Sequence, residues 1–123
     1  MREMSKELLR FSDLLGHILY SVINKDNREL VFTLDTGEKY RLFHVQDCCE
    51  DVFIEDIVGD LVDLIDSPVL MAEEVSNHEY EDVDTSGTWT FYKLATVRGY
   101  VTVRWYGESN GYYSESVDWE RVK

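Results

Sequence analysis

The sequence predicts an α+β fold. We expect a single domain over residues 1–123, with two antiparallel meanders of about three strands each, an N-terminal helix and a central acidic amphipathic helix. Three observations lead to this class. The length of 123 residues fits one domain, and no linker, repeat or low-complexity tract divides it. Apolar residues make up 44% of the chain, which is enough to fill a core. Their spacing alternates between helical and strand periods.

The first half of the chain is predicted to form a helix followed by three strands. Apolar residues recur at helical spacing within residues 1–15, and Gly16 is expected to end that helix. Residues 18–22 alternate between apolar and polar side chains, as a half-buried strand does. Polar turn clusters then separate two further strands, at 30–34 and 39–44. These three strands would form the first meander.

The centre of the chain has the spacing of an amphipathic helix. Between Ile54 and Ile65, apolar residues recur at positions i, i+3, i+4, i+7, i+8 and i+11. On the opposite side, Asp56, Asp60 and Asp63 would stack along one exposed face. Like charges at this spacing repel one another, so the stripe indicates a surface kept for a partner. Pro68 follows the helix and would prevent its continuation.

The second half is predicted to form mostly strands around an acidic loop. A strand is expected at 69–75, and the polar segment from His78 to Gly87 is expected to be a loop. Asn110-Gly111 is a strong hairpin signal, because both residues readily adopt positive φ. The second meander would therefore consist of the strands 89–96, 100–106 and 112–118.

The charge of the chain is strongly negative and unevenly distributed. There are 25 acidic and 12 basic residues, which gives a net charge of −13. The segment 42–92 contains fourteen acidic residues and no Lys or Arg. This charge disfavours direct binding to nucleic acid or to an anionic membrane, since both would repel the protein. The charge indicates either a solvated acidic face or a surface for a basic partner.

We predict a cytoplasmic protein. No apolar run is long enough to span a membrane, and charged residues interrupt the N-terminus where a secretory signal would be apolar. The two cysteines are adjacent and cannot form a disulfide framework, which suits a reducing cytosol. A vicinal disulfide between them remains a minor alternative, because it would close a strained ring.

One cluster carries the side chains that bind zinc or iron: His44, Asp47, Cys48, Cys49 and Glu50. Its spacing is not that of a usual zinc site, and a second Cys/His group is missing. The alternative is that one cysteine packs in the core while the polar residues hold the loop. Cysteine catalysis is not expected, because the surrounding acids disfavour a thiolate.

The aromatic residues around the predicted hairpin are candidates for contact with a partner. Trp105 and Tyr113 would fill the core by alternation, whereas Tyr106 and Tyr112 would fall on the opposite face. Together with the acidic helix, these residues make up the predicted partner surface: Glu55, Asp56, Asp60, Asp63, Tyr106, Asn110 and Tyr112.

Three stretches give the chain a resemblance to a known family: His44–Glu50 (HVQDCCE), Ile54–Leu61 (IEDIVGDL) and Trp105–Ser114 (WYGESNGYYS). From about Leu15 to Val117 the sequence resembles an uncharacterised domain family found in bacteriophages and bacterial genomes. The resemblance implies a phage or prophage origin and activity in the bacterial cytoplasm. It implies no reaction and no ligand.

Three functions are consistent with these features, and none of them makes the chain an enzyme with an identifiable catalytic site. The first is a small acidic phage-type protein that binds a basic surface of a host protein, for example to inhibit a nucleic-acid-binding defence effector. The second is a metal-binding domain centred on the His44–Glu50 run. The third is a structural or modulating phage component. The oligomeric state is not predicted.

Overall fold

The computed structural model describes residues 7–82 and 85–123, which form almost entirely antiparallel strands. Strand accounts for 59% and helix for 7%, and no described helix reaches seven residues. The predicted α+β fold is therefore wrong. The protein has an all-β architecture of two four-stranded sheets. Within the described ranges, no helix is long and apolar enough to cross a membrane.

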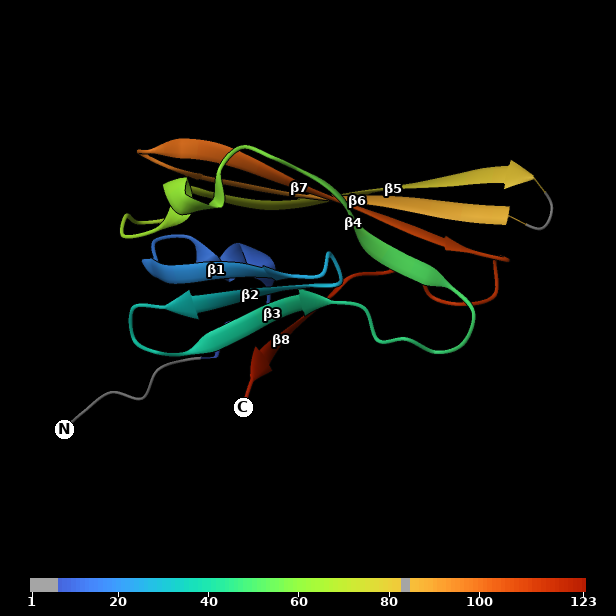
Figure 1. The fold of residues 1–123 in the computed structure, drawn as a ribbon, viewed down its shortest axis with the longest axis horizontal. Coiled ribbons are helices and arrows are strands. Elements are labelled where there is room, and N and C mark those ends of the chain that lie inside the picture. The colour runs from blue at the N-terminus through green and yellow to red at the C-terminus, as the bar shows by residue number, and fades with distance from the viewer. Residues whose placement is uncertain (1–6, 83–84) are drawn as a thin grey trace.

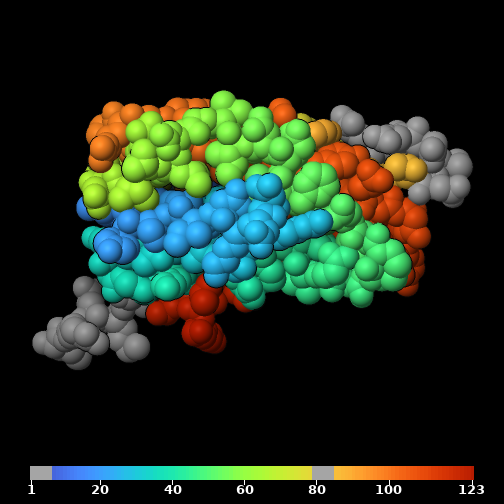
Figure 2. Space-filling view, in the orientation of Figure 1, coloured from blue at the N-terminus to red at the C-terminus, as the bar shows by residue number. Residues whose placement is uncertain are grey.

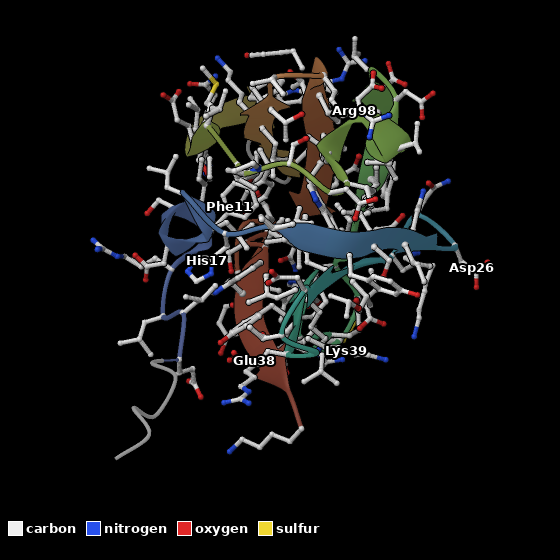
Figure 3. All side chains as sticks on the ribbon, turned by 90° about the vertical axis from the view of Figure 1, so that its left-hand side faces the viewer. Phe11, His17, Asp26, Glu38, Lys39 and Arg98 are labelled. Atoms are coloured by element: carbon white, nitrogen blue, oxygen red, sulfur yellow. A yellow bond between two sulfur atoms is a disulfide. The ribbon has the colours of Figure 1, made fainter. Side chains whose placement is uncertain are left out.

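The first sheet has the strand order β1-β2-β3-β8. It contains the predicted first meander, and its fourth strand comes from the end of the chain. Asp26 and Asn27 form the turn at the tip of β1 (Figure 3) with φ values of 54° and 58°, which Asp and Asn tolerate better than most residues. The bounds are β1 (Leu19–Lys25), β2 (Glu29–Leu34), β3 (Lys39–Phe43) and β8 (Asp118–Val122).

The second sheet has the strand order β4-β7-β6-β5, so β4 and β5 are its edges. The loop predicted over 78–87 is wrong in the described residues, because β5 and β6 remain paired there, with His78 opposite Thr88. The predicted strands 89–96 and 100–106 are present and longer than expected. The bounds are β4 (Asp51–Val58), β5 (Met71–Asp82), β6 (Thr85–Thr96) and β7 (Gly99–Ser109).

The predicted strand 112–118 and the hairpin before it are also wrong. Residues 110–117 form an irregular loop that leads from β7 in the second sheet to β8 in the first (Figure 1). Asn110 Oδ1 accepts a hydrogen bond from the Tyr112 N–H at 2.9 Å, and Gly111 has a φ of 95°. The Asn-Gly pair therefore makes a local turn, but the turn does not join two paired strands.

Both sheets bury their facing sides in one shared core (Figure 1). The largest buried side chains come from both layers, with Trp105 and Tyr92 in the second sheet and Tyr40 and Phe32 in the first. In the space-filling view, β1 lies against the green segment that leads from β4 into the 3-10 turn η2 (Leu61–Leu64) (Figure 2).

The N-terminal helix predicted over 1–15 is not found in the described part of that segment. Only one 3-10 turn is present, η1 (Phe11–Leu14), and residues 1–6 lie outside the description. The segment is held by tertiary contacts instead of helical hydrogen bonds. Phe11 lies between the sheets (Figure 3), its ring centroid 4.7 Å from that of Tyr92 and 5.6 Å from that of Trp119. Trp119 also donates a hydrogen bond from Nε1 to the carbonyl of Leu8 at 2.8 Å.

The central acidic helix predicted from Ile54 to Ile65 is wrong, and a β-bulge explains the misleading spacing. In the pairing of β4 with β7, the register shifts between Ile54 and Asp56, so Glu55 is an extra residue. The bulge moves the next inward-facing apolar residue from position 56 to Ile57. An i, i+3 spacing therefore arises in a strand, where it imitates the period of a helix.

Candidate functional site

β5 and β6 extend past the first sheet, and the loop 110–117 passes beneath them (Figure 1). Residues of these three elements line a polar cleft. The cavity has a volume of about 320 Å³. Its lining contains no Lys or Arg among the described residues. The side chains that define it come from three elements: Glu74, Ser76 and His78 from β5, Ser86, Thr88 and Thr90 from β6, and Glu115 from the loop.

The period of a strand places these residues on one face. Farther along the same face, Ala72 of β5 and Leu94 of β6 are buried in the core. Towards the other end of the strands, the inward residues become polar, and Ser76 lies directly opposite Thr90. The inner face of the second sheet thus changes from apolar to polar along its length, and the polar end forms the wall of the cleft.

Glu115 is the most buried charged group of the cleft, with 7% of its surface exposed. Its Oε1 accepts hydrogen bonds from the hydroxyls of Thr88 at 2.7 Å and Ser86 at 3.3 Å. Its Oε2 accepts a hydrogen bond from the Ser109 hydroxyl. In the described parts of the chain, no Lys, Arg or His nitrogen lies within ion-pair distance of this carboxylate. Its partners are neutral hydroxyls.

His78 contacts the same two hydroxyls from the other side. Its Nε2 lies 2.9 Å from Ser86 Oγ, and its Nδ1 lies 3.3 Å from Thr88 Oγ1. The two hydroxyls therefore lie between the imidazole of His78 and the carboxylate of Glu115 and link the two side chains.

A second carboxylate, Glu74, lies on the same wall. Tyr92 donates its phenolic hydrogen to Glu74 Oε2 at 2.8 Å. Burial raises the pKa of Tyr92 above its ordinary value, and the negative charge of Glu74 raises it further. Tyr92 therefore remains a neutral donor, and the charge of Glu74 is not cancelled by it.

The contact between Ser86 and His78 does not make a nucleophile and its base. In a catalytic triad the carboxylate contacts the second nitrogen of the histidine and orients the ring. Here the Glu115 carboxylate contacts the serine hydroxyl, and Ser86 is only 2% exposed. The arrangement is suited to binding a polar group, because its acceptors converge on a cavity without a free nucleophile.

A buried ion pair, His44–Glu50, fixes the loop next to the cleft. His44 Nε2 lies 2.7 Å from Glu50 Oε2, and His44 Nδ1 donates to the carbonyl of Ser116 at 2.7 Å. The backbone N–H groups of Asp47 and Cys48 donate to the same carboxylate at 2.8 and 2.9 Å.

The hydrogen bonds to Glu50 decide its charge. Burial alone would raise the pKa of Glu50. The hydrogen bonds from the Cys48 N–H, from His44 and from the Asp47 N–H outweigh that effect and lower the pKa to about 2 from its ordinary value of 4.5. Glu50 is therefore an anion at neutral pH. His44 lies between this anion and the carbonyl of Ser116.

The hydrogen bonds of His44 and Glu50 occupy atoms that the predicted metal site would use as ligands. Both ring nitrogens of His44 and both carboxylate oxygens of Glu50 already have partners, so a metal would have to displace them. Asp47, Cys48 and Cys49 are exposed, and the expectation that one cysteine packs in the core is wrong. The two cysteines are joined as a vicinal disulfide. Nowhere in residues 7–82 and 85–123 do three or more His, Cys, Asp or Glu side chains gather as metal ligands would.

The acidic residues predicted to form a helical stripe lie in separate environments. Glu55 and Asp56 flank Arg104 of β7, whose Nε donates to Glu55 Oε1 at 2.8 Å and whose Nη2 lies 3.7 Å from Asp56 Oδ2. Asp60 accepts a hydrogen bond from the backbone of η2. Asp63 packs against the tight turn at Gly99, where an added Cβ would lie 2.7 Å from its Oδ2. They do not form one stripe.

The aromatic candidates are also divided. Tyr106 lies on the outer face of the second sheet, its ring centroid 4.6 Å from that of Trp89 and 6.2 Å from that of Phe53. Tyr112, which is 82% exposed, lies with Asn110 in the loop 110–117. Glu55 and Asp56 are linked to Tyr106 through Arg104, which pairs with both acids and lies over the Trp89 ring that contacts Tyr106.

The sequence analysis missed the residues of the cleft, and one signal could have indicated them. Polar residues alternate at 74, 76 and 78 and again at 86, 88 and 90, which places each set on one face of a strand. The segment from His78 to Gly87 was expected to be a loop, and that expectation concealed the alternation. Nothing in the local sequence of Glu115 indicates that it would meet these strands.

Comparison with protein families matches residues 12–119 to the family described as "Domain of unknown function (DUF7448)". No curated protein and no solved structure matches the chain. The matched range covers most of the chain, including every strand of the second sheet and the loop 110–117, and it agrees with the expected likeness to an uncharacterised domain family. The chain belongs to the DUF7448 family.

Proposed function

We propose that the protein is an acidic interaction protein that binds a basic surface of another protein. One observation carries the proposal: the edge strand β5 keeps its negative charge, whereas the other edge does not. On β4, Glu55 and Asp56 are paired with Arg104. Among the ion pairs of the described residues, none includes Glu73 or Glu74 of β5.

Several arginines of the fold form internal ion pairs. Arg28 pairs with an aspartate of β4, Arg41 and Arg104 pair with carboxylates of neighbouring strands, and Arg121 pairs with Glu38 just before β3. With 25 acids and 12 bases in the chain, an excess of carboxylates remains. A surface of this kind attracts a basic partner over long range and repels acidic ones.

The proposed partner is a nucleic-acid-binding protein of a bacterial host, and occupation of its basic surface would inhibit it. The net charge and the expected phage origin support this form of the proposal. The regular spacing of carboxylates along a helix does not support it, because that helix is absent. Activity in the bacterial cytoplasm is part of the same proposal.

Affinity capture from a bacterial lysate at low and high salt tests the proposal. The bait is compared with two doubly substituted variants of equal charge: Glu73→Gln/Glu74→Gln on β5, and Asp26→Asn/Asp35→Asn in turns of the first sheet. We expect basic proteins that elute at high salt and compete with added DNA, with the β5 variant alone losing them. Equal loss in both variants, or capture that does not change with salt, would contradict the proposal.

A further inference from the structure

We infer that the cleft between β5, β6 and the loop 110–117 is a binding pocket for a primary ammonium group, the side chain of a lysine on the partner. The inference rests on the proposed function for the source of the lysine. The pocket itself can be tested without the partner. Two glutamates are buried among the described residues, Glu50 and Glu115.

Glu50 and Glu115 are buried to a similar degree, with 3% and 7% of their surfaces exposed. Glu50 has the imidazole of His44 at 2.7 Å and two backbone N–H donors. Glu115 has three hydroxyl donors and, within the described residues, no Lys, Arg or His nitrogen close enough for an ion pair. A buried carboxylate without a positive partner is costly, and a cation in the adjacent cavity would lower that cost.

The described walls of the cleft provide no Lys or Arg to act as this cation. The side chains contributed by β5 and β6 fall between Glu74 and Thr90, inside the segment 42–92 that contains no Lys or Arg. The loop residues that line the cleft, from Gly111 to Val117, contain none either. One basic side chain, His78, belongs to the described walls, and its ring nitrogens contact the hydroxyls of Ser86 and Thr88. Glu74 and Glu115 therefore have no Lys or Arg partner in these walls, and an ammonium group from another molecule would supply one.

The hydrogen-bonding pattern favours an ammonium over a guanidinium. A guanidinium binds a carboxylate best with two parallel bonds, one to each oxygen. Both oxygens of Glu115 already accept bonds from hydroxyls, Oε1 from Ser86 and Thr88 and Oε2 from Ser109. An ammonium is a compact charge with three donors, which can be shared among a carboxylate and hydroxyl oxygens such as those of Ser76 and Thr90.

The remaining features of the cavity fit the rest of a lysine side chain. Its volume of about 320 Å³ lies at the small end of ligand pockets. Tyr113 and Val117 line it together with the polar residues, and they offer apolar surface for the methylene stem. A lysine can therefore place its charge among the acceptors while its stem remains in apolar contact.

Titration with blocked amino acids tests the inference. The probes are N-acetyl-lysine methylamide, N-acetyl-arginine methylamide and the uncharged N-acetyl-norleucine methylamide, followed by amide NMR shifts. We expect the lysine probe to shift resonances of β5, β6 and residues 110–117, with an affinity at least about tenfold above those of the other two. Equal shifts from arginine or norleucine would overturn the inference.

Two substitutions locate the site. Glu115→Gln is expected to reduce lysine affinity at least about tenfold. If that variant does not fold, Glu74→Gln replaces it, because Glu74 is exposed and its substitution leaves the core intact.

The matched control is Glu73→Gln, which removes the same charge from the neighbouring position on the opposite face of β5. Equal losses in the control and the cleft variant would overturn the inference. If lysine binding fails while salt-dependent capture of basic proteins persists, the pocket is refuted and the proposed function remains.

Discussion

Replacing Glu50 by Gln tests whether the His44–Glu50 pair stabilises the fold as its geometry indicates. In the native protein, the Glu50 carboxylate accepts hydrogen bonds from His44 and from the backbone N–H groups of Asp47 and Cys48. A glutamine has one acceptor oxygen, and its amide group would point hydrogens at one of these donors. We therefore expect the variant to be less stable than the native protein at neutral pH.

The size and the pH range of the effect follow from the pKa of Glu50. Folding lowers this pKa from 4.5 to about 2, so the folded protein binds the proton more weakly than the unfolded chain does. Stabilisation from a depressed carboxyl pKa is fully present above about pH 4.5 and is lost as the pH falls towards 2. The difference between these two pKa values corresponds to at most a roughly 300-fold change in the folding equilibrium constant.

Urea denaturation of the native protein and the variant at a series of pH values measures this effect. The two stability curves should lie apart at neutral pH and approach each other between pH 4.5 and 2, because the variant has no proton to bind at this position. Asp47→Asn, an exposed position in the same loop, should follow the native curve. Curves that remain parallel down to pH 2 would refute the role assigned to Glu50.

Three further substitutions have defined outcomes. Gly107→Ala places a Cβ 2.7 Å from the main-chain oxygen of Glu115, so it should cost about 1–3 kcal/mol in urea denaturation and weaken binding in the cleft. Cys48→Ser/Cys49→Ser should change stability by no more than about 0.5 kcal/mol, because both residues are exposed; a larger loss would show that the pair is structural. Trp119→Phe removes the hydrogen bond to the N-terminal segment and should lower the free energy of unfolding by about 1 kcal/mol or more. An unchanged melting curve would contradict that assignment.

The strands that the sequence predicts correctly are those in which local signals and tertiary structure agree. β2 and β3 alternate regularly, and polar turn residues lie on either side of them. The same holds for β6 and β7 around the turn at Arg98-Gly99. In these segments, the face that alternation makes apolar is also the face that the other sheet covers. No information from distant parts of the chain is needed to predict them.

The two predicted helices failed for different reasons. From Ile54 onward, a single bulged residue, Glu55, turned a strand period into an apparent helical one, and single-sequence spacing cannot distinguish the two. In residues 7–15, the apolar spacing is real, since Leu8, Phe11 and Leu14 are all buried. That burial arises from contacts with both sheets, which stabilise an extended segment and one 3-10 turn without a helix.

The candidate site was beyond prediction because its parts are distant in the sequence and polar. His78 and Ser86 meet across a hairpin whose residues read as a loop, and Glu115 reaches them only because the chain passes from one sheet to the other. Strand pairing of this kind depends on long-range contacts. By contrast, the sequence marks the His44–Glu50 run as a distinct cluster, and its hydrogen bonds hold a loop in place.

The two clusters act on one element, the loop 110–117. His44 holds this loop through the carbonyl of Ser116, and the neighbouring residue, Glu115, carries the carboxylate of the cleft. Because Ser116 directly follows Glu115, the hydrogen bond to the Ser116 carbonyl restrains the backbone that carries the Glu115 side chain. The acceptors of the cleft are thus positioned before a ligand arrives, which reduces the entropy lost on binding. Loss of the Glu50 carboxylate should therefore weaken lysine binding, even though Glu50 lies outside the cleft.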